Sequence, residues 1–488
     1  MAAGLRLARR VATLPIEIGV GSHKQLDSIT TRWLSLNPSL VDVKVDSRSV
    51  LTIGELQIQD TSCPYLYAWD GKRFRFVNDI LGASPVGLPL SEGRYIDADP
   101  DEYVWLGSEE LLQPQDGNYL LQITEELREV LYLDEAKLMV VDHPRGTEVH
   151  PTDKLCPGKP FPTGELVMLQ GRQPLLKATR TDGLDVTERL TEDDGKVLSP
   201  LKLRDTHLRG LAEPHGVTLD FGPLAVERPL VLALTGWLRF GGATANLAAS
   251  TDPDLPFPFP KLEVETHDGK WKAVEVVVGA PAGKTKTILV DLAGKLEPGS
   301  RRLRLTTAFE IHWDRIALFE RADPAQTRIT AFAPTSTDLH WHGIGELEKL
   351  PWYVPQTPIH DCVMAAAPWR AIPSGWCTRY GDVQELVAQR DNALVLINSG
   401  DELTLRFDAS RLPARLPGCV RDFFLYSAGW DKDADFHTKL GSTVEPIPWH
   451  GMNDQQYGQE PRPAFESDGW ISKYNTRWVG PRPLTRKP

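Results

Sequence analysis

The sequence has little cysteine, and none of it is clustered. Five cysteines stand far apart in 488 residues, with no C-x-x-C pair. Structural zinc sites need closely spaced cysteine or histidine ligands. The sequence therefore argues against a zinc site built on cysteine. A disulfide between Cys362 and Cys377 is compatible with an oxidising compartment, and buried free thiols are the alternative.

Long apolar runs and basic runs are also missing. No stretch approaches the ~20 consecutive apolar residues of a membrane helix, so we expect no membrane span. The formal net charge is −12, and no Lys/Arg-rich segment provides the basic face that phosphate binding requires. Nucleic acid is therefore not an expected partner. The Arg-containing N-terminus is broken by Pro15 and shows no clear cleavage site, so we interpret it as a strand entering a domain, or as an internal start within a longer gene.

Short apolar runs separated by turn residues fill most of the chain. The 39 glycines and 39 prolines are spread along it, and such punctuation favours strands and turns over helices. Hairpins are expected at Asp70-Gly71 and Asp268-Gly269. Evenly spaced strands over residues 217–320 are typical of a β-sandwich or jelly roll. We predict a mainly β, multidomain protein built of antiparallel β-sandwich or jelly-roll domains with little helix.

The N-terminal segment resembles a known module. Residues 16–33, IEIGVGSHKQLDSITTRW, and residues 41–55, VDVKVDSRSVLTIGE, are similar to the ASPIC/UnbV module. Leu26-Asp27, Ile29 and Trp33 carry the resemblance, and Leu34-Ser35-Leu36 replaces the usual Pro-x-Gly. Segments 63–87, 124–144, 378–383 and 429–452 resemble the region that follows this module in large exported bacterial proteins with FG-GAP propeller repeats, which are similar to cartilage acidic proteins.

This resemblance implies the C-terminal region of an exported protein. An extracytoplasmic location (secreted, periplasmic or cell surface), a role in adhesion or ligand binding, and an FG-GAP propeller partner encoded elsewhere would follow from it. We expect four domains. They are an ASPIC/UnbV-like module at 1–58, a β-rich domain with connecting loops at 59–199, a sandwich at 200–322 that resembles galactose-binding domains, and a β-rich C-terminal domain with an aromatic tail at 323–488.

An acidic stretch, GWDKDADFHT at 429–438, carries aspartates at alternate positions: Asp431, Asp433 and Asp435. This is the spacing of the first three ligands of an EF-hand. The glycine and glutamate that an EF-hand needs are absent, because Phe436 and Ser442 stand there. A shorter loop completed by Glu445, Asp422 or backbone carbonyls would still hold a structural calcium ion. The alternatives are a polar turn and a pair of carboxylates for glycoside hydrolysis.

A second acidic stretch is TEELREVLYLD at 124–134. Its acidic residues are Glu125, Glu126, Glu129 and Asp134. We interpret them as a solvated strand edge, with a second cation site as the alternative.

Two histidines stand in DLHWHGIGE at 338–346. Alternate residues of a strand share one face, so His340 and His342 can both reach one transition metal ion, with His360 as third ligand. The tetrapeptide His340 to Gly343 also occurs in multicopper oxidases, but the further His-x-His pairs of those enzymes are missing. Satisfied or exposed histidines are the alternative interpretation.

Aromatic residues are dense in segment 449–478. Trp449, Tyr457 and Trp470 are candidates for stacking on sugar rings, and packing against another domain is the alternative. Together these features predict a non-catalytic binding or interaction module of a calcium-stabilised exported β-protein, whose ligand is a glycan or a protein. The competing class is an enzyme, either a metal-dependent oxidoreductase using His340 and His342 or a glycan-active hydrolase.

Overall fold

The computed structural model describes residues 17–27, 29–32, 38–41, 44–51, 64–161, 164–204, 209–255, 258–365 and 371–481. The chain divides into two compact units, one containing the first 57 residues and the other spanning 58–483. In the first unit, β1 (Gln25–Leu26) pairs with β4 (Val45–Asp46), and β2 (Ile29–Arg32) pairs with β3 (Pro38–Val41). Trp33 and Leu34-Ser35-Leu36, on which the module resemblance partly rests, lie outside the described residues.

The predicted fold class is confirmed. The described residues form thirty strands and only two α-helices, α1 (Gly242–Thr251) and α2 (Gly469–Tyr474). Single 3-10 turns are η1 (Thr187–Arg189), η2 (Pro324–Gln326), η3 (Gln384–Leu386), η4 (Ala409–Arg411), η5 (Asp454–Gln456) and η6 (Glu466–Asp468). None of the described helices is long and apolar enough to cross a membrane.

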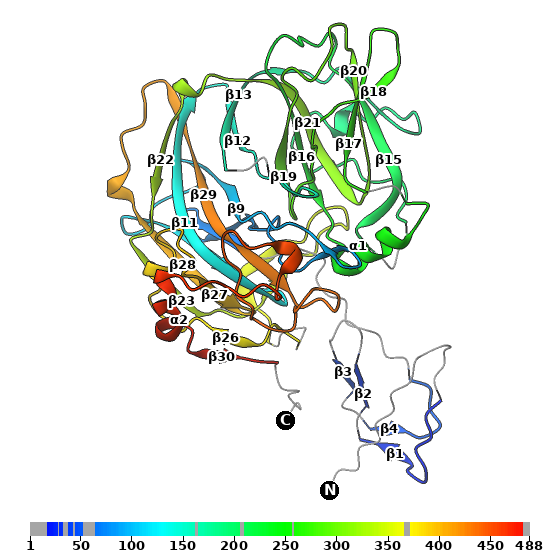
Figure 1. The fold of residues 1–488 in the computed structure, drawn as a ribbon, viewed down its shortest axis with the longest axis vertical. Coiled ribbons are helices and arrows are strands. Elements are labelled where there is room, and N and C mark those ends of the chain that lie inside the picture. Colours follow the sequence, from blue (N-terminus) through cyan, green and yellow to red (C-terminus); the bar gives the residue numbers. More distant parts are fainter. Residues whose placement is uncertain are drawn as a thin grey trace. The chain divides into compact units, whose positions relative to one another are not determined.

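The second unit is built on a sandwich that we call the frame, made of two five-stranded sheets (Figure 1). The first sheet has the order β23 (Ser336–Trp341), β28 (Asp401–Asp408), β10 (Asn118–Thr124), β5 (Tyr65–Trp69) and β6 (Phe74–Asp79). The second has the order β22 (Arg328–Phe332), β11 (Glu129–Pro144), β29 (Cys419–Asp433) and β9 (Asp101–Ser108), and β27 (Val395–Asn398) also pairs with β11. Apolar side chains of both sheets, such as Leu121, Leu133 and Leu405, form one core between them.

A second sandwich, which we call the insertion, occupies residues 148–321. One sheet has the order β12 (Glu148–Pro151), β13 (Leu166–Gln173), β21 (Ile311–Arg321), β16 (Leu230–Leu238) and β19 (Lys286–Asp291). The other has the order β14 (Lys177–Arg180), β15 (Leu211–Asp220), β20 (Arg302–Phe309), β17 (Lys261–Glu265) and β18 (Trp271–Ala273). Its core holds Leu219, Leu232 and Leu303 from facing strands.

The sheet pairing divides the chain differently from the predicted domains. Strand β13 pairs with β21, so the predicted boundary at 199/200 falls inside the insertion. The frame takes strands from both sides of the insertion, because β11 pairs with β29 and β10 pairs with β28. Local sequence shows each strand but not which distant strand lies beside it, and this is why consecutive domains were expected.

Three two-stranded ladders complete the second unit. They are β7 (Pro89–Ser91) with β8 (Arg94–Tyr95), β24 (Gly345–Leu347) with β25 (Pro358–Val363), and β26 (Gly375–Cys377) with β30 (Arg477–Val479). The frame and the insertion are joined by apolar contacts, where Val141 and Phe424 pack with Val149 and Met168. Lys286 of the insertion also forms salt bridges with Asp79 and Glu102 of the frame.

Candidate metal centre

Three histidines gather around one buried carboxylate at the end of the first frame sheet. Antiparallel pairing of β23 with β28 places His340 directly opposite Glu402. Beyond the strand, the amides of His342 and Gly343 both donate to the carbonyl of Gly400, which keeps His342 beside the same strand. The hairpin of β24 and β25 carries His360 to the other side of the carboxylate.

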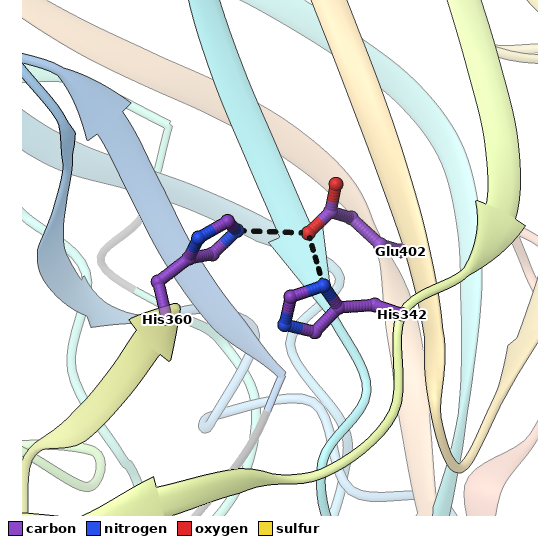
Figure 2. Close-up of side chains that lie close together, drawn as sticks. All are labelled: His342, His360 and Glu402. Carbon is purple, nitrogen blue, oxygen red and sulfur yellow. Dashed lines mark hydrogen bonds and ion pairs between the residues drawn. The ribbon is translucent and has the colours of Figure 1, made fainter. Parts of the chain in front are cut away.

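Glu402 is the common partner of all three imidazoles. Its Oε2 lies 3.1 Å from Nε2 of His360 and 3.4 Å from Nδ1 of His342. Figure 2 shows both rings directed at this single oxygen. The other oxygen, Oε1, lies 3.0 Å from Nε2 of His340. A possible ligand atom from each of His342, His360 and Glu402 lies within 4.8 Å of the others, which is a spacing that one metal ion can bridge.

Aromatic and polar neighbours hold these groups in place. The rings of His342 and His360 stack with centroids 4.6 Å apart, and Tyr67 packs edge-on against His360 at 4.9 Å. Nδ1 of His360 is bonded to Asp361 at 2.9 Å. A carboxylate behind a metal-binding imidazole orients the ring and increases its basicity.

The hydrogen bonds in this group favour an ionised Glu402 and protonated rings of His340 and His360. Burial by itself favours the neutral acid, but hydrogen bonds from His340 and His360 outweigh burial and lower the pKa of Glu402 to about 2. The hydrogen bond to Glu402 raises the pKa of His340. Burial opposes a charge on His360, yet Glu402 and Asp361 raise its pKa. A metal cation bound here would balance the negative charge of Glu402 in place of these protons.

The donor set fits a transition metal ion. Two imidazoles and one carboxylate are the ligands of several zinc and non-haem iron sites, in which they leave positions open for water or a substrate. Nδ1 is the ring nitrogen of His342 that faces Oε2 of Glu402, so it is the atom of this ring that would bind the ion. His342, His360 and Glu402 can therefore hold one ion, with His340 beside them.

The structure brings together the three histidines that were predicted from the sequence as a metal group. Sequence reasoning missed Glu402, because DELTLRFD at 401–408 reads as an ordinary strand. The only available signal was its acidic residue near the start of a strand, and the register that places it opposite His340 depends on tertiary structure.

The predicted calcium loop is not a loop. Residues 429–433 belong to β29, and Asp431 and Asp433 face Leu131 and Glu129 across the pair with β11. Asp431 is buried. The turn expected there begins only after Asp433, because the ladder with β11 continues to that residue.

The other two predicted calcium ligands lie apart from Asp431. Lys432 points to the opposite face of β29 and donates to the carbonyls of Val444 and Glu445, so Glu445 lies on that opposite side. Asp435 accepts a hydrogen bond from the amide of His437 and lies against Gly242, at the start of α1. The structure therefore does not bring the four predicted calcium ligands together around one ion. These ligands were Asp431, Asp433, Asp435 and Glu445.

The stretch at 124–134 is not a solvated edge, because its four acidic residues are buried. Glu126 accepts hydrogen bonds from Tyr67 and Gly345, and Asp134 accepts them from Asn392 and His450. These two carboxylates have the partners that buried acids need.

The aromatic side chains proposed for sugar stacking lie in the frame core. Trp449, Tyr457 and Trp470 are all buried and present no ring face to solvent, which corrects that prediction. Exposed aromatic rings occur elsewhere. Trp376 and Trp478 face each other across β26 and β30 and are 46% and 60% exposed.

Cys362 and Cys377 are both free thiols. Cys362 is exposed on β25, and Cys377 is buried in β26. The structure therefore has free thiols at these two positions, which is the alternative to the disulfide considered from the sequence.

No family model matches this chain, and no curated protein matches it either. The resemblance to ASPIC/UnbV proteins therefore stays a prediction from the residues quoted above.

Proposed function

We propose that this protein binds one divalent transition metal ion of the zinc class through His342, His360 and Glu402. The observation that carries the proposal is the convergence of two stacked imidazoles on one buried carboxylate oxygen. Zinc prefers nitrogen and carboxylate donors of this kind. The ion would replace the protons that these two rings share with Glu402.

Elemental analysis and calorimetry test this proposal. The full chain, stripped with chelator and titrated with Zn²⁺, is expected to bind one ion per chain, and a His342→Ala/His360→Ala variant is expected to lose that binding. A matched control is His437→Ala, because His437 is exposed and lies in another segment. Equal zinc binding by wild type and the double variant would overturn the proposal.

Catalysis is tested separately from binding. Three protein ligands leave coordination positions that a water molecule or a substrate can take. Turnover on a panel of hydrolytic and oxidative substrates, lost in the double variant, would assign the protein to the metal-dependent enzymes. Metal binding without turnover would assign it to the non-catalytic metal-binding modules.

A second candidate function is glycan binding, favoured by the exposed pair Trp376 and Trp478. Their ring centroids are 5.3 Å apart with an interplanar angle of 75°. Arg477 alternates with Trp478 in β30 and points to the other face of the ladder, where it lies over the ring of Tyr380. Exposed aromatic faces suit pyranose rings.

A glycan array screened with wild type and with Trp376→Ala/Trp478→Ala tests the second candidate. Trp105→Ala is the control, because Trp105 is also exposed but lies on β9. Binding that only the double variant loses supports glycan recognition. An identical pattern for all three proteins, or no glycan bound by wild type, would rule it out.

A further inference from the structure

One ligand of the proposed zinc site, His360, stands on a separate hairpin. His342 follows β23 and Glu402 belongs to β28, and these two strands are paired in the frame. His360 approaches them from the two-stranded ladder of β24 and β25 (Figure 2). The geometry of the three ligands therefore depends on where this hairpin is held.

The loop of the hairpin, residues 348–357, is attached to the insertion at two points. The indole N–H of Trp237, in β16, donates a hydrogen bond to the carbonyl of Tyr353 at 3.0 Å. The ammonium group of Lys284 donates to the carbonyl of Gln356. Trp237 is 4% exposed and Lys284 is 3% exposed. Hydrogen bonds of buried groups are costly to lose, because the remaining partner has no water to replace them.

Aromatic contacts reinforce the first attachment. The ring of His312, in β21, stacks on Trp237 with centroids 4.4 Å apart and an interplanar angle of 11°. Trp352 of the loop meets the ring of His312 edge-on at 5.7 Å. Trp237 and His312 are opposite each other in the ladder of β16 and β21. The sheet of the insertion therefore presents both rings to the loop.

The second attachment leads to His360 through a series of ring contacts. Lys284 lies over the rings of Tyr65 and Phe76, at 5.0 Å and 5.4 Å from their centroids. Phe76 packs edge-on against Tyr67 at 5.7 Å, and Tyr67 packs edge-on against His360 at 4.9 Å. A displacement of Lys284 would therefore change the packing of the rings that support His360.

We infer that Lys284 and Trp237 are positioning residues for the zinc site, so that zinc binding is coupled to docking of the hairpin loop on the insertion. Gln356, which Lys284 holds, stands four positions before His360 in the sequence. The inference rests on the proposed binding of zinc. Because coupling between two binding events is reciprocal, zinc would also tighten the contact between Trp237 and Tyr353.

Zinc affinity of the full chain tests the positioning role. Lys284→Met keeps the length of the side chain and removes its N–H donors. It is expected to lower the affinity for Zn²⁺ by about tenfold, because groups that orient metal ligands contribute on that scale. Lys284→Arg restores a donor and is expected to recover part of the affinity. Lys295→Met is the matched control, since Lys295 is exposed in the same sandwich, and it should leave the affinity unchanged.

Spectroscopy distinguishes a displaced ligand from a less stable protein. Co²⁺ bound in place of Zn²⁺ has visible absorption bands that depend on the geometry of its ligands. In folded Lys284→Met these bands are expected to shift in position or intensity. Lower stability alone would leave the spectrum of the folded protein unchanged.

The reciprocal effect is measured on Trp237 itself. In NMR spectra of wild type, its indole N–H signal is assigned by its absence from Trp237→Phe. Zinc is expected to slow the hydrogen exchange of this N–H, because the ion fixes the hairpin that carries the carbonyl of Tyr353. The phenylalanine of Trp237→Phe keeps a ring against His312 and removes the donor, so this variant should also bind Zn²⁺ more weakly than wild type.

The outcomes separate this inference from the proposed function. Wild type that binds no zinc would overturn both. Zinc bound equally by wild type, Lys284→Met and Trp237→Phe would overturn the inference alone and leave the metal site in place. A lowered affinity in Lys284→Met with an unchanged Co²⁺ spectrum and no recovery in Lys284→Arg would also overturn it.

Two further outcomes are decisive. If Lys284→Met does not fold, Trp237→Phe decides, because lowered affinity supports the positioning role and equal affinity refutes it. Hydrogen exchange of the Trp237 indole that is the same with and without zinc would refute the coupling.

Discussion

The side-chain amide of Gln122 donates a hydrogen bond to Oε1 of Glu402 at 2.6 Å, across the neighbouring strands β10 and β28. This bond holds the carboxylate by the oxygen that faces away from His342 and His360. The other oxygen, Oε2, is thereby left directed at both of these rings.

Replacing Gln122 is therefore expected to weaken metal binding without removing a ligand. Gln122→Leu should lower the affinity for Zn²⁺ by about tenfold or more, because groups that orient metal ligands contribute on that scale. Competition with a chromophoric chelator measures the change. The exposed Gln389 provides the control, and an unchanged affinity in a folded Gln122→Leu protein would contradict the role given to this amide.

The three histidines are expected to differ in importance. The side chain of His340 is 38% exposed and meets Oε1, whereas that of His360 is 12% exposed and meets Oε2. His360→Ala should abolish stoichiometric zinc binding, and His340→Ala should keep one ion per chain with a smaller loss of affinity. Zinc content after dialysis distinguishes the two variants, and the reverse order would show that His340 is the ligand.

Acid stability is expected to depend on Glu148 in the insertion. Burial opposes its ionisation, but hydrogen bonds from His150 and Arg315 lower the pKa of Glu148 from 4.5 to about 2. A lowered carboxyl pKa stabilises the fold above pH 4.5, and this stabilisation is lost as the pH falls toward 2. It amounts to about 1–2 kcal/mol after solvent screening is counted.

Urea unfolding of wild type and Glu148→Gln at pH 7 and pH 3 measures this effect. The difference in the free energy of unfolding between the two proteins should shrink at pH 3. A difference that stays constant between the two pH values would exclude the assigned ion pair with Arg315.

Gly429 is expected to be irreplaceable in β29. A Cβ atom at this position would lie 2.2 Å from the carbonyl oxygen of Tyr132 and 3.1 Å from Cα of Leu133. Since both are backbone atoms of β11, Gly429→Ala should destabilise the protein by about 1–3 kcal/mol or more. Gly469→Ala is the control, because nothing lies within 4 Å of that Cβ, and equal Tm values for the two variants would disprove the clash.

The strand-rich fold could be predicted because its signals are local. Turn residues and short apolar runs mark most strands, and the Asp70 carboxylate accepts the amides of Lys72 and Arg73 in the expected turn. The helix α1 was not predicted, because GATANLAAST is made mostly of small residues without a marked apolar face. Its place is set by packing, as with Ala243 and Ala245 in the insertion core.

The sequence indicated only some of the residues that lie together in the structure. His340 and His342 can be recognised by their alternate positions in the sequence, whereas Glu402 joins them only through strand register. In the same way, Asp433 can be recognised as acidic, but only the pairing of β11 with β29 places Glu129 opposite it. The acidic residues of a stretch such as 124–134 are buried because other strands cover them. The local sequence does not show which strands those are.

Asp142 of β11 and Arg328 of β22 are opposite each other in the frame ladder, so the insertion leaves and rejoins the frame at one place. Once the insertion has folded, these two strands behave as if a short turn joined them. The entropy cost of closing the loop then falls to that of a hairpin. We therefore expect the insertion to fold first, with amides of β16 and β21 protected from pulsed hydrogen exchange before those of β11 and β22. Simultaneous protection of both sets of amides would show that the frame folds without prior folding of the insertion.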